Sequence, residues 1–187
     1  MLTIPNALTF ARFLGIPLFI YLALDLKADG WAILVLAIGG ATDYFDGKLA
    51  RALGQESKFG EIADPTIDRL YIAATLVVLY LRDAVPVWLI AVLVLRDVFM
   101  AIVAAVLALK GFAPLKVTYL GKAATFNLLY AFPFLLLALN ESWYGTLAFI
   151  FGWAFAIWGV CLYLGTAVGY FRTALMTITV HPHIIEG

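Results

Sequence analysis

Four aspartates in two pairs give this chain its clearest means of doing chemistry. Asp43 and Asp46 lie near the end of one apolar run, and Asp64 and Asp68 lie at the start of the next. Spacings of three and four residues place both carboxylates of a pair on one face of an α-helix. Two neighbouring helices can therefore direct four carboxylates toward one cavity. Carboxylate oxygens are preferred ligands of Mg²⁺, Mn²⁺ and Ca²⁺, and such ions would remove the repulsion among the carboxylates.

Small residues and a cation accompany the first aspartate pair. Gly47 and Ala50 leave the same helical face bare, so that a ligand or another backbone can approach closely. Arg51 follows at the edge of that face, and its planar guanidinium suits a pair of phosphate oxygens. Gly60 would allow a similar approach to the second helix. Single residues of these types often mark a helix end at a membrane surface, but the whole ordered set indicates a site for a metal-bound diphosphate.

The elements that carry these residues belong to a very apolar chain. Hydrophobic residues make up 65% of the 187 residues and charged residues only 13%, whereas a soluble domain has about 45–50% and about 25%. So short a chain cannot hide that much apolar surface, so the bilayer must solvate much of it. The net charge of zero indicates no bulk attraction for nucleic acid. The single cysteine, Cys161, is interpreted as a small helix-packing residue.

Six segments are long and apolar enough to cross a membrane, which takes roughly 20 mainly apolar residues. We expect them at about 5–25, 31–53, 61–82, 86–109, 120–139 and 143–170. Backbone groups in lipid must pair within their own segment, which favours helices. The chain is therefore predicted to be one all-α integral membrane domain, residues 1–187, with a polar, metal-binding cavity.

Basic residues are unequally divided between the two ends of these spans. Six spans place both termini on one side, and most Lys and Arg residues of the loops fall on that side. Cytoplasmic loops carry this excess. The distribution predicts a multi-pass protein of the cytoplasmic membrane, with the acidic cavity facing the cytoplasm.

The ordered polar set matches a known signature. Asp43-x2-Asp46-Gly47-x2-Ala50-Arg51-x8-Gly60-x3-Asp64-x3-Asp68 resembles the complete signature of the CDP-alcohol phosphatidyltransferases, with all eight fixed positions and every spacing present. The six-helix membrane fold of that family agrees with the number of predicted spans. Members of the family use divalent metal while an alcohol displaces CMP from a CDP-linked lipid, and they often form homodimers.

The resemblance implies a role for each residue of the set. The metal ligands of two Mg²⁺ or Mn²⁺ ions would be Asp43, Asp46, Asp64 and Asp68. Asp68 would also act as the general base that removes the proton of the attacking hydroxyl. The pocket for the CDP moiety would be lined by Gly47, Ala50 and Arg51.

The acceptor alcohol must be sought outside the signature. Residues 3–17 resemble the opening of phosphatidylglycerophosphate and cardiolipin synthases, and Asn6 and Arg12 are candidate substrate-binding positions there, unless Arg12 merely snorkels from an interfacial helix. Arg96 lies within the fourth span and Lys122 at the start of the fifth, and together they could hold the acceptor's phosphate. The alternatives are a local ion pair with Asp97 and a membrane-surface anchor, respectively.

Two departures favour one branch of the family. Phosphatidylglycerophosphate synthases typically have Arg-Glu where this chain has Arg96-Asp97, and Gly-Lys-x-Lys-Thr-x-x-Gln where it has "GKAATFN". The segments "DPTIDRLY", "LRD" and "VTYLGKAATF" look more like bacterial cardiolipin synthases. The hypothesis is that CDP-diacylglycerol and phosphatidylglycerol give cardiolipin and CMP. The alternative is synthesis of phosphatidylglycerophosphate from glycerol 3-phosphate.

A different class of function uses the same carboxylates without catalysis. A metal or lipid transporter would more naturally show repeated halves and a polar path through the membrane. A non-catalytic membrane scaffold would have no need for the complete signature. We therefore favour the enzyme.

Overall fold

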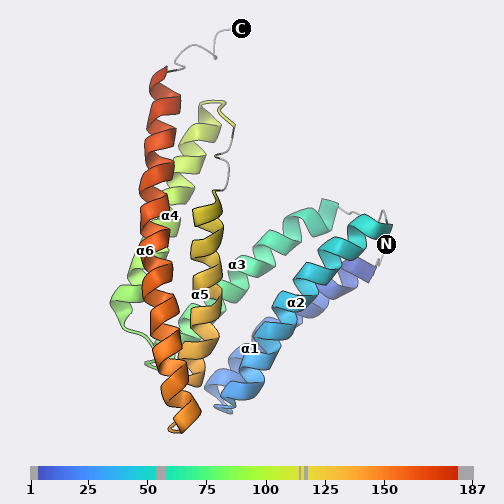
Figure 1. Ribbon diagram of the computed structural model, residues 1–187. Coiled ribbons are helices and arrows are strands. Elements are labelled where there is room, and N and C mark those ends of the chain that lie inside the picture. Colours follow the sequence, from blue (N-terminus) through green and yellow to red (C-terminus); the bar gives the residue numbers. More distant parts are fainter. Residues whose placement is uncertain (1–3, 54–57, 114, 116–117, 181–187) are drawn as a thin grey trace. The chain divides into compact units, whose positions relative to one another are not determined.

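The computed structural model describes residues 4–53, 58–113, 115 and 118–180, and for residues 4–7, 43–53, 58–65 and 180 it describes the helical backbone without the side chains. The described residues form six α-helices (Figure 1), which are α1 Ile4–Leu24, α2 Asp29–Leu53, α3 Lys58–Leu81, α4 Val87–Leu109, α5 Tyr119–Leu137 and α6 Trp143–Val180. Each helix corresponds to one expected segment, which confirms the all-α prediction for this part of the chain.

Three of the described helices are long and apolar enough to cross a membrane. They cover Val87–Leu109, Tyr119–Leu137 and Trp143–Thr179. The apolar parts of α1 and α2 with described side chains, Leu8–Leu24 and Asp29–Thr42, are shorter. The chain is therefore an all-helical protein with membrane-spanning segments, and the expectation of six spans stays a prediction for α1, α2 and α3.

The chain packs as two compact units. Unit 1 contains residues 1–84 and 135–148, and unit 2 contains residues 85–134 and 149–187. In unit 1, α1 packs against both α2 and α3. Its core includes the fully buried side chains of Phe19 on α1 and of Val78 and Leu79 on α3. The expectation of one domain over the whole chain stays a prediction.

A bidentate ion pair joins the helix ends of unit 1. The two Nη atoms of Arg82, just after α3, lie 2.8 and 3.2 Å from the carboxylate oxygens of Asp29 at the start of α2. The same guanidinium donates to the main-chain oxygen of Ala23 near the end of α1. Charge-assisted fork-to-fork pairs of this kind fix direction as well as distance. Arg82 therefore holds three helix ends together.

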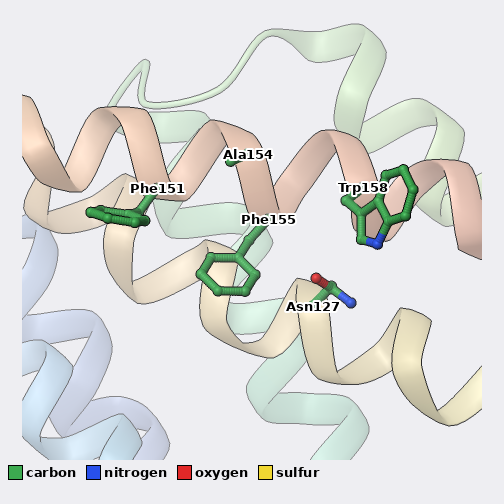
Figure 2. Close-up of a pocket in the computed structure, with 5 residues that line it drawn as sticks. All are labelled: Asn127, Phe151, Ala154, Phe155 and Trp158. Carbon is green, nitrogen blue, oxygen red and sulfur yellow. The ribbon is translucent and has the colours of Figure 1, made fainter.

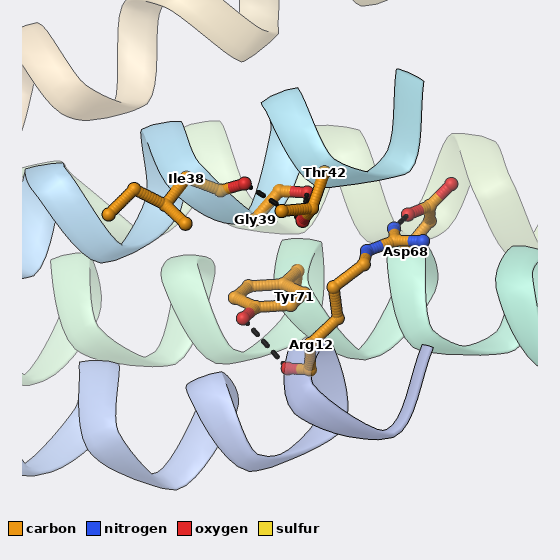
Figure 3. Close-up of polar contacts among 6 residues, drawn as sticks. All are labelled: Arg12, Ile38, Gly39, Thr42, Asp68 and Tyr71. Carbon is orange, nitrogen blue, oxygen red and sulfur yellow. Dashed lines mark hydrogen bonds and ion pairs between the residues drawn. The ribbon is translucent and has the colours of Figure 1, made fainter. Parts of the chain in front are cut away.

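Two glycines let a tyrosine ring enter between the helices of unit 1. A Cβ atom at Gly15 of α1 would lie 2.1 Å from the hydroxyl of Tyr71, and one at Gly39 of α2 would lie 3.3 Å from the same atom. The Tyr71 hydroxyl donates a hydrogen bond of 2.8 Å to the main-chain oxygen of Arg12 (Figure 3). The missing side chains thus allow α3 to reach the backbone of α1.

Replacing Gly15 with alanine is expected to destabilise the protein by about 1–3 kcal/mol, because the new methyl group would overlap the Tyr71 hydroxyl. The matched control is Gly40→Ala on α2, where a Cβ would meet no described atom within 4 Å. The control should be neutral or stabilising, since alanine favours helices. Thermal unfolding in detergent measures both, and a Tyr71→Phe background should relieve the Gly15→Ala cost. Equal losses in the two glycine variants would contradict this account.

Unit 2 is held together by aromatic side chains along α4, α5 and α6. The rings of Phe134 on α5 and Phe155 on α6 stack with centroids 6.0 Å apart. Phe99 on α4 and Phe171 on α6 lie 5.3 Å apart. Cys161 on α6 is exposed, so the expectation that it packs between helices was wrong for the described part of the chain.

The end of α6 extends beyond the expected boundary near residue 170, to Val180. Ala174 packs against the buried side chains of Val103 and Leu107 of α4. Phe112, Leu115 and Ile178 cover this cluster. The extension therefore has apolar contacts in unit 2 through Ala174 and Ile178.

Candidate functional site

The backbone is helical at both aspartate pairs of the signature, as their spacing requires. Helix α2 runs unbroken through the first aspartate pair and α3 runs through the second. The side chains of six residues lie outside those that the structure describes, namely Asn6, Asp43, Asp46, Ala50, Arg51 and Asp64, and glycines 47 and 60 fall in the same backbone-only segments. The metal site and the CDP pocket therefore stay predictions.

Asp68 is the one signature aspartate whose side chain is described, and it forms an ion pair with Arg12 of α1 (Figure 3). The Arg12 side chain is only 3% exposed, whereas that of Asp68 is 48% exposed. Arg12 therefore does not snorkel toward solvent, and the structure brings it together with the expected general base. The exposed part of the carboxylate is accessible to a ligand.

Tyr71 forms a second contact between α3 and Arg12, through the main-chain oxygen of Arg12. It lies three residues after Asp68 on α3, a spacing that places both on one helical face. Its hydrogen bond to the main chain of Arg12 means that α3 contacts both the backbone and the side chain of that arginine. Sequence reasoning missed Tyr71. The only signal was its spacing from Asp68.

The donor set suits divalent cations by its chemistry. Among the residues with described side chains, no group of three or more His, Cys, Asp or Glu gathers as a metal site. Three of the four expected ligands lie outside that part of the chain. Carboxylates are the ligands that hard cations take, and Asp68 offers an accessible one. Asp68 therefore fits the expected metal by its chemistry, and the site as a whole stays a prediction.

Arg96 belongs to a three-residue polar cluster of unit 2. Its Nη1 lies 3.1 Å from Oδ1 of Asp97, which is the local pair that the sequence left open. The Tyr163 hydroxyl on α6 donates to the same oxygen at 2.5 Å, and the guanidinium carbon lies 3.7 Å from the centre of the Tyr163 ring. The Nε of Arg96 is buried and has no hydrogen-bond partner among the described residues. Sequence reasoning missed Tyr163.

Lys122 lies at a helix start that is tied to α6. The Thr118 hydroxyl accepts a hydrogen bond from the Gly121 amide at 3.2 Å, and the Tyr170 hydroxyl accepts one from the Thr118 amide at 2.8 Å. A Cβ at Gly121 would lie 2.7 Å from the Tyr170 hydroxyl, which explains the glycine. Lys122 itself is exposed, with its Nζ 5.8 Å from the Tyr119 ring centre. It is therefore available to an anion.

An open groove of about 410 Å³ also lies in unit 2 (Figure 2). Its lining residues are Asn127, Phe151, Ala154, Phe155 and Trp158. The Asn127 amide donates to the main-chain oxygen of Ala123 at 2.8 Å. Its mainly aromatic walls, with no charged residue in the lining, suit hydrocarbon.

Comparison with known proteins decides what the signature means. The family model described as CDP-alcohol phosphatidyltransferase matches residues 2–158. The chain belongs to this family. It is thus a membrane-embedded transferase, and the resemblance drawn from the aspartate signature is confirmed. Membership covers five of the six helices and the beginning of α6.

Relatives within the CDP-alcohol phosphatidyltransferase family carry two kinds of name. "Cardiolipin synthase (CMP-forming)" of Streptomyces coelicolor is 50% identical over 91% of this chain and 81% of its own length. "Putative cardiolipin synthase" of Mycobacterium tuberculosis is 38% identical over 98% of this chain and 88% of its own length. "CDP-diacylglycerol--glycerol-3-phosphate 3-phosphatidyltransferase" of Cereibacter sphaeroides is 36% identical over 66% of this chain and 58% of its own length.

Proposed function

We propose that this phosphatidyltransferase makes cardiolipin and CMP from CDP-diacylglycerol and phosphatidylglycerol. The observation that carries the proposal is 50% identity to a CMP-forming cardiolipin synthase over 91% of the chain. The relative named for glycerol 3-phosphate is less similar and aligns with a smaller part of the chain. The departures at Arg96-Asp97 and at "GKAATFN" point the same way.

The donor lipid occupies the aspartate signature. Gly47, Ala50 and Arg51 line the pocket for CDP, and two Mg²⁺ or Mn²⁺ ions are held by Asp43, Asp46, Asp64 and Asp68. Bound there, divalent cations neutralise the diphosphate and favour the departure of CMP. The ion pair with Arg12 fixes the direction of the Asp68 carboxylate. Asn6 and Arg12 of α1 contribute to substrate binding.

The reaction is one displacement at phosphorus. Asp68 accepts the proton of the acceptor's hydroxyl as that oxygen bonds to the phosphorus joined to diacylglycerol. The bond between this phosphorus and the oxygen of CMP breaks, and CMP leaves with the electron pair. The new phosphodiester stays with the lipid, and CMP is the soluble product.

Arg96 and Lys122 bind the phosphate of the acceptor. The buried Nε of Arg96, unpartnered among the described residues, supports this role because an unsatisfied buried donor costs free energy until a ligand accepts from it. Lys122 supports it by its exposure at an anchored helix start. Guanidinium and ammonium groups are the usual partners of phosphate oxygens.

The protein works as one domain of six spans in the cytoplasmic membrane, with the metal-binding cavity open to the cytoplasm. The excess of basic residues on one side supports this orientation. A soluble nucleotide product suits release on that side. Homodimerisation is part of the proposal because it is frequent in the family.

The proposal is tested by incubating purified protein with CDP-diacylglycerol, Mg²⁺ or Mn²⁺, and one acceptor at a time. We expect cardiolipin and CMP with phosphatidylglycerol, and no lipid product with glycerol 3-phosphate, as measured by mass spectrometry of the lipids. Phosphatidylglycerophosphate formed from glycerol 3-phosphate, with no cardiolipin, would replace the proposal by its alternative. Absence of CMP release with both acceptors would favour a scaffold or transporter.

A further inference from the structure

One tyrosine contacts two consecutive residues of a neighbouring helix. Successive residues of an α-helix point about 100° apart and do not face each other. Arg96 and Asp97 of α4 nevertheless form an ion pair of 3.1 Å. Tyr163 of α6 contacts both partners, with its ring under the guanidinium and its hydroxyl on the carboxylate. The tyrosine thus bridges a pair that helical geometry alone would not align.

The cluster determines the plane of the Arg96 guanidinium. An arginine side chain has several rotatable bonds, and it is costly at membrane depth unless paired. The aromatic ring restricts one face of the guanidinium, and Asp97 accepts from Nη1 on one edge. The Nε hydrogen remains buried without an acceptor among the described residues. This N–H lacks one acceptor, and a phosphate oxygen has the charge and the lone pairs to accept from it.

We propose that Tyr163 is a positioning residue for acceptor recognition, which presents the Nε edge of Arg96 to the phosphate of phosphatidylglycerol. The proposal rests on the proposed function, in which Arg96 binds that phosphate. Tyr163 acts through Arg96 and Asp97. Its ring keeps the guanidinium plane fixed, and its hydroxyl keeps Asp97 directed toward Nη1.

Two substitutions separate the contributions of the ring and the hydroxyl. Tyr163→Phe keeps the ring and loses the hydrogen bond to Asp97, and it should raise the KM for phosphatidylglycerol roughly tenfold. Tyr163→Leu loses both contacts and should raise that KM on the order of a hundredfold. The KM for CDP-diacylglycerol should stay unchanged, and kcat should stay within about twofold. The matched control is Tyr80→Phe, an exposed tyrosine on α3 whose ring hydroxyl has no part in the cluster.

Arg96→Gln, measured beside these variants, separates the inference from the function on which it rests. A raised KM for phosphatidylglycerol in Arg96→Gln but in neither Tyr163 variant would overturn the role of Tyr163 and leave the acceptor site standing. Unchanged acceptor KM in all three, with cardiolipin still formed, would remove Arg96 from the acceptor site. If Tyr163→Phe lowers kcat, raises both KM values and lowers the melting temperature together, the role of Tyr163 is merely structural and the proposal is overturned.

Discussion

Replacing Asp68 with asparagine is expected to lower CMP release by about 10²- to 10⁴-fold, the usual contribution of a general base. The amide has nearly the shape of the carboxylate but cannot accept the hydroxyl proton at neutral pH. It is also a weaker metal ligand and a weaker partner for Arg12, with which Asp68 forms an ion pair. The loss should appear mainly in kcat, because the proton moves in the transition state.

The control for this substitution is Asp25→Asn, which makes the same chemical change at an exposed position after α1. Release of CMP from CDP-diacylglycerol, followed by chromatography at saturating phosphatidylglycerol, compares the two variants with the unmodified protein. Asp25→Asn should keep full activity and Asp68→Asn should not. Equal rates in both variants would remove Asp68 from the role of general base.

Removal of divalent cations should abolish activity, and Mg²⁺ or Mn²⁺ should restore it. Without a cation, the diphosphate of the donor would meet a cluster of carboxylates, and like charges at close range repel strongly. The leaving CMP would also carry its developing charge without a counter-ion. Treatment with a chelator followed by addition of single metal salts, with CMP release as the measurement, checks this expectation.

A ligand variant makes the metal prediction specific to the signature. Asp64→Asn removes one expected ligand, so the metal concentration that gives half of the maximal rate should rise by roughly tenfold or more. In Asp25→Asn that concentration should not change. Full activity after chelation would exclude the proposed metal site, and an unchanged metal requirement in Asp64→Asn would remove that residue from the ligand set.

The sequence predicted helices well because their signal is local. Apolar runs of spanning length and the turn residues between them placed most helix ends within a few residues of those observed, as with α4 at Val87–Leu109. The end of α6 was missed because its last turns combine Arg172 with several threonines, which look like a departure from the membrane. Ala174 of these turns packs against Val103 and Leu107, residues far away in the chain that a local pattern does not reveal.

The sequence predicted those residues of the candidate site that stand out by their charge or by their spacing. The aspartates, Arg12 and Arg96 stand out because charges are rare in this chain. Their partners Tyr71 and Tyr163 do not, since aromatic residues within apolar spans usually face lipid or fill a core. Glycines such as Gly15 indicate that something comes close, but only tertiary packing shows that it is the Tyr71 hydroxyl.

Helix α6 is too long to lie wholly within the hydrocarbon core of a bilayer, even when it is tilted. Its 38 residues extend about 57 Å at the helical rise of about 1.5 Å per residue, whereas the hydrocarbon core is about 30 Å thick. Spanning helices tilt by up to about 40°, which would still leave a turn or more outside. Helix α6 therefore crosses the boundary between the hydrocarbon core and water. Spin labels placed along it, with relaxation agents dissolved in lipid or water, would read the position of the bilayer surface directly from this protein.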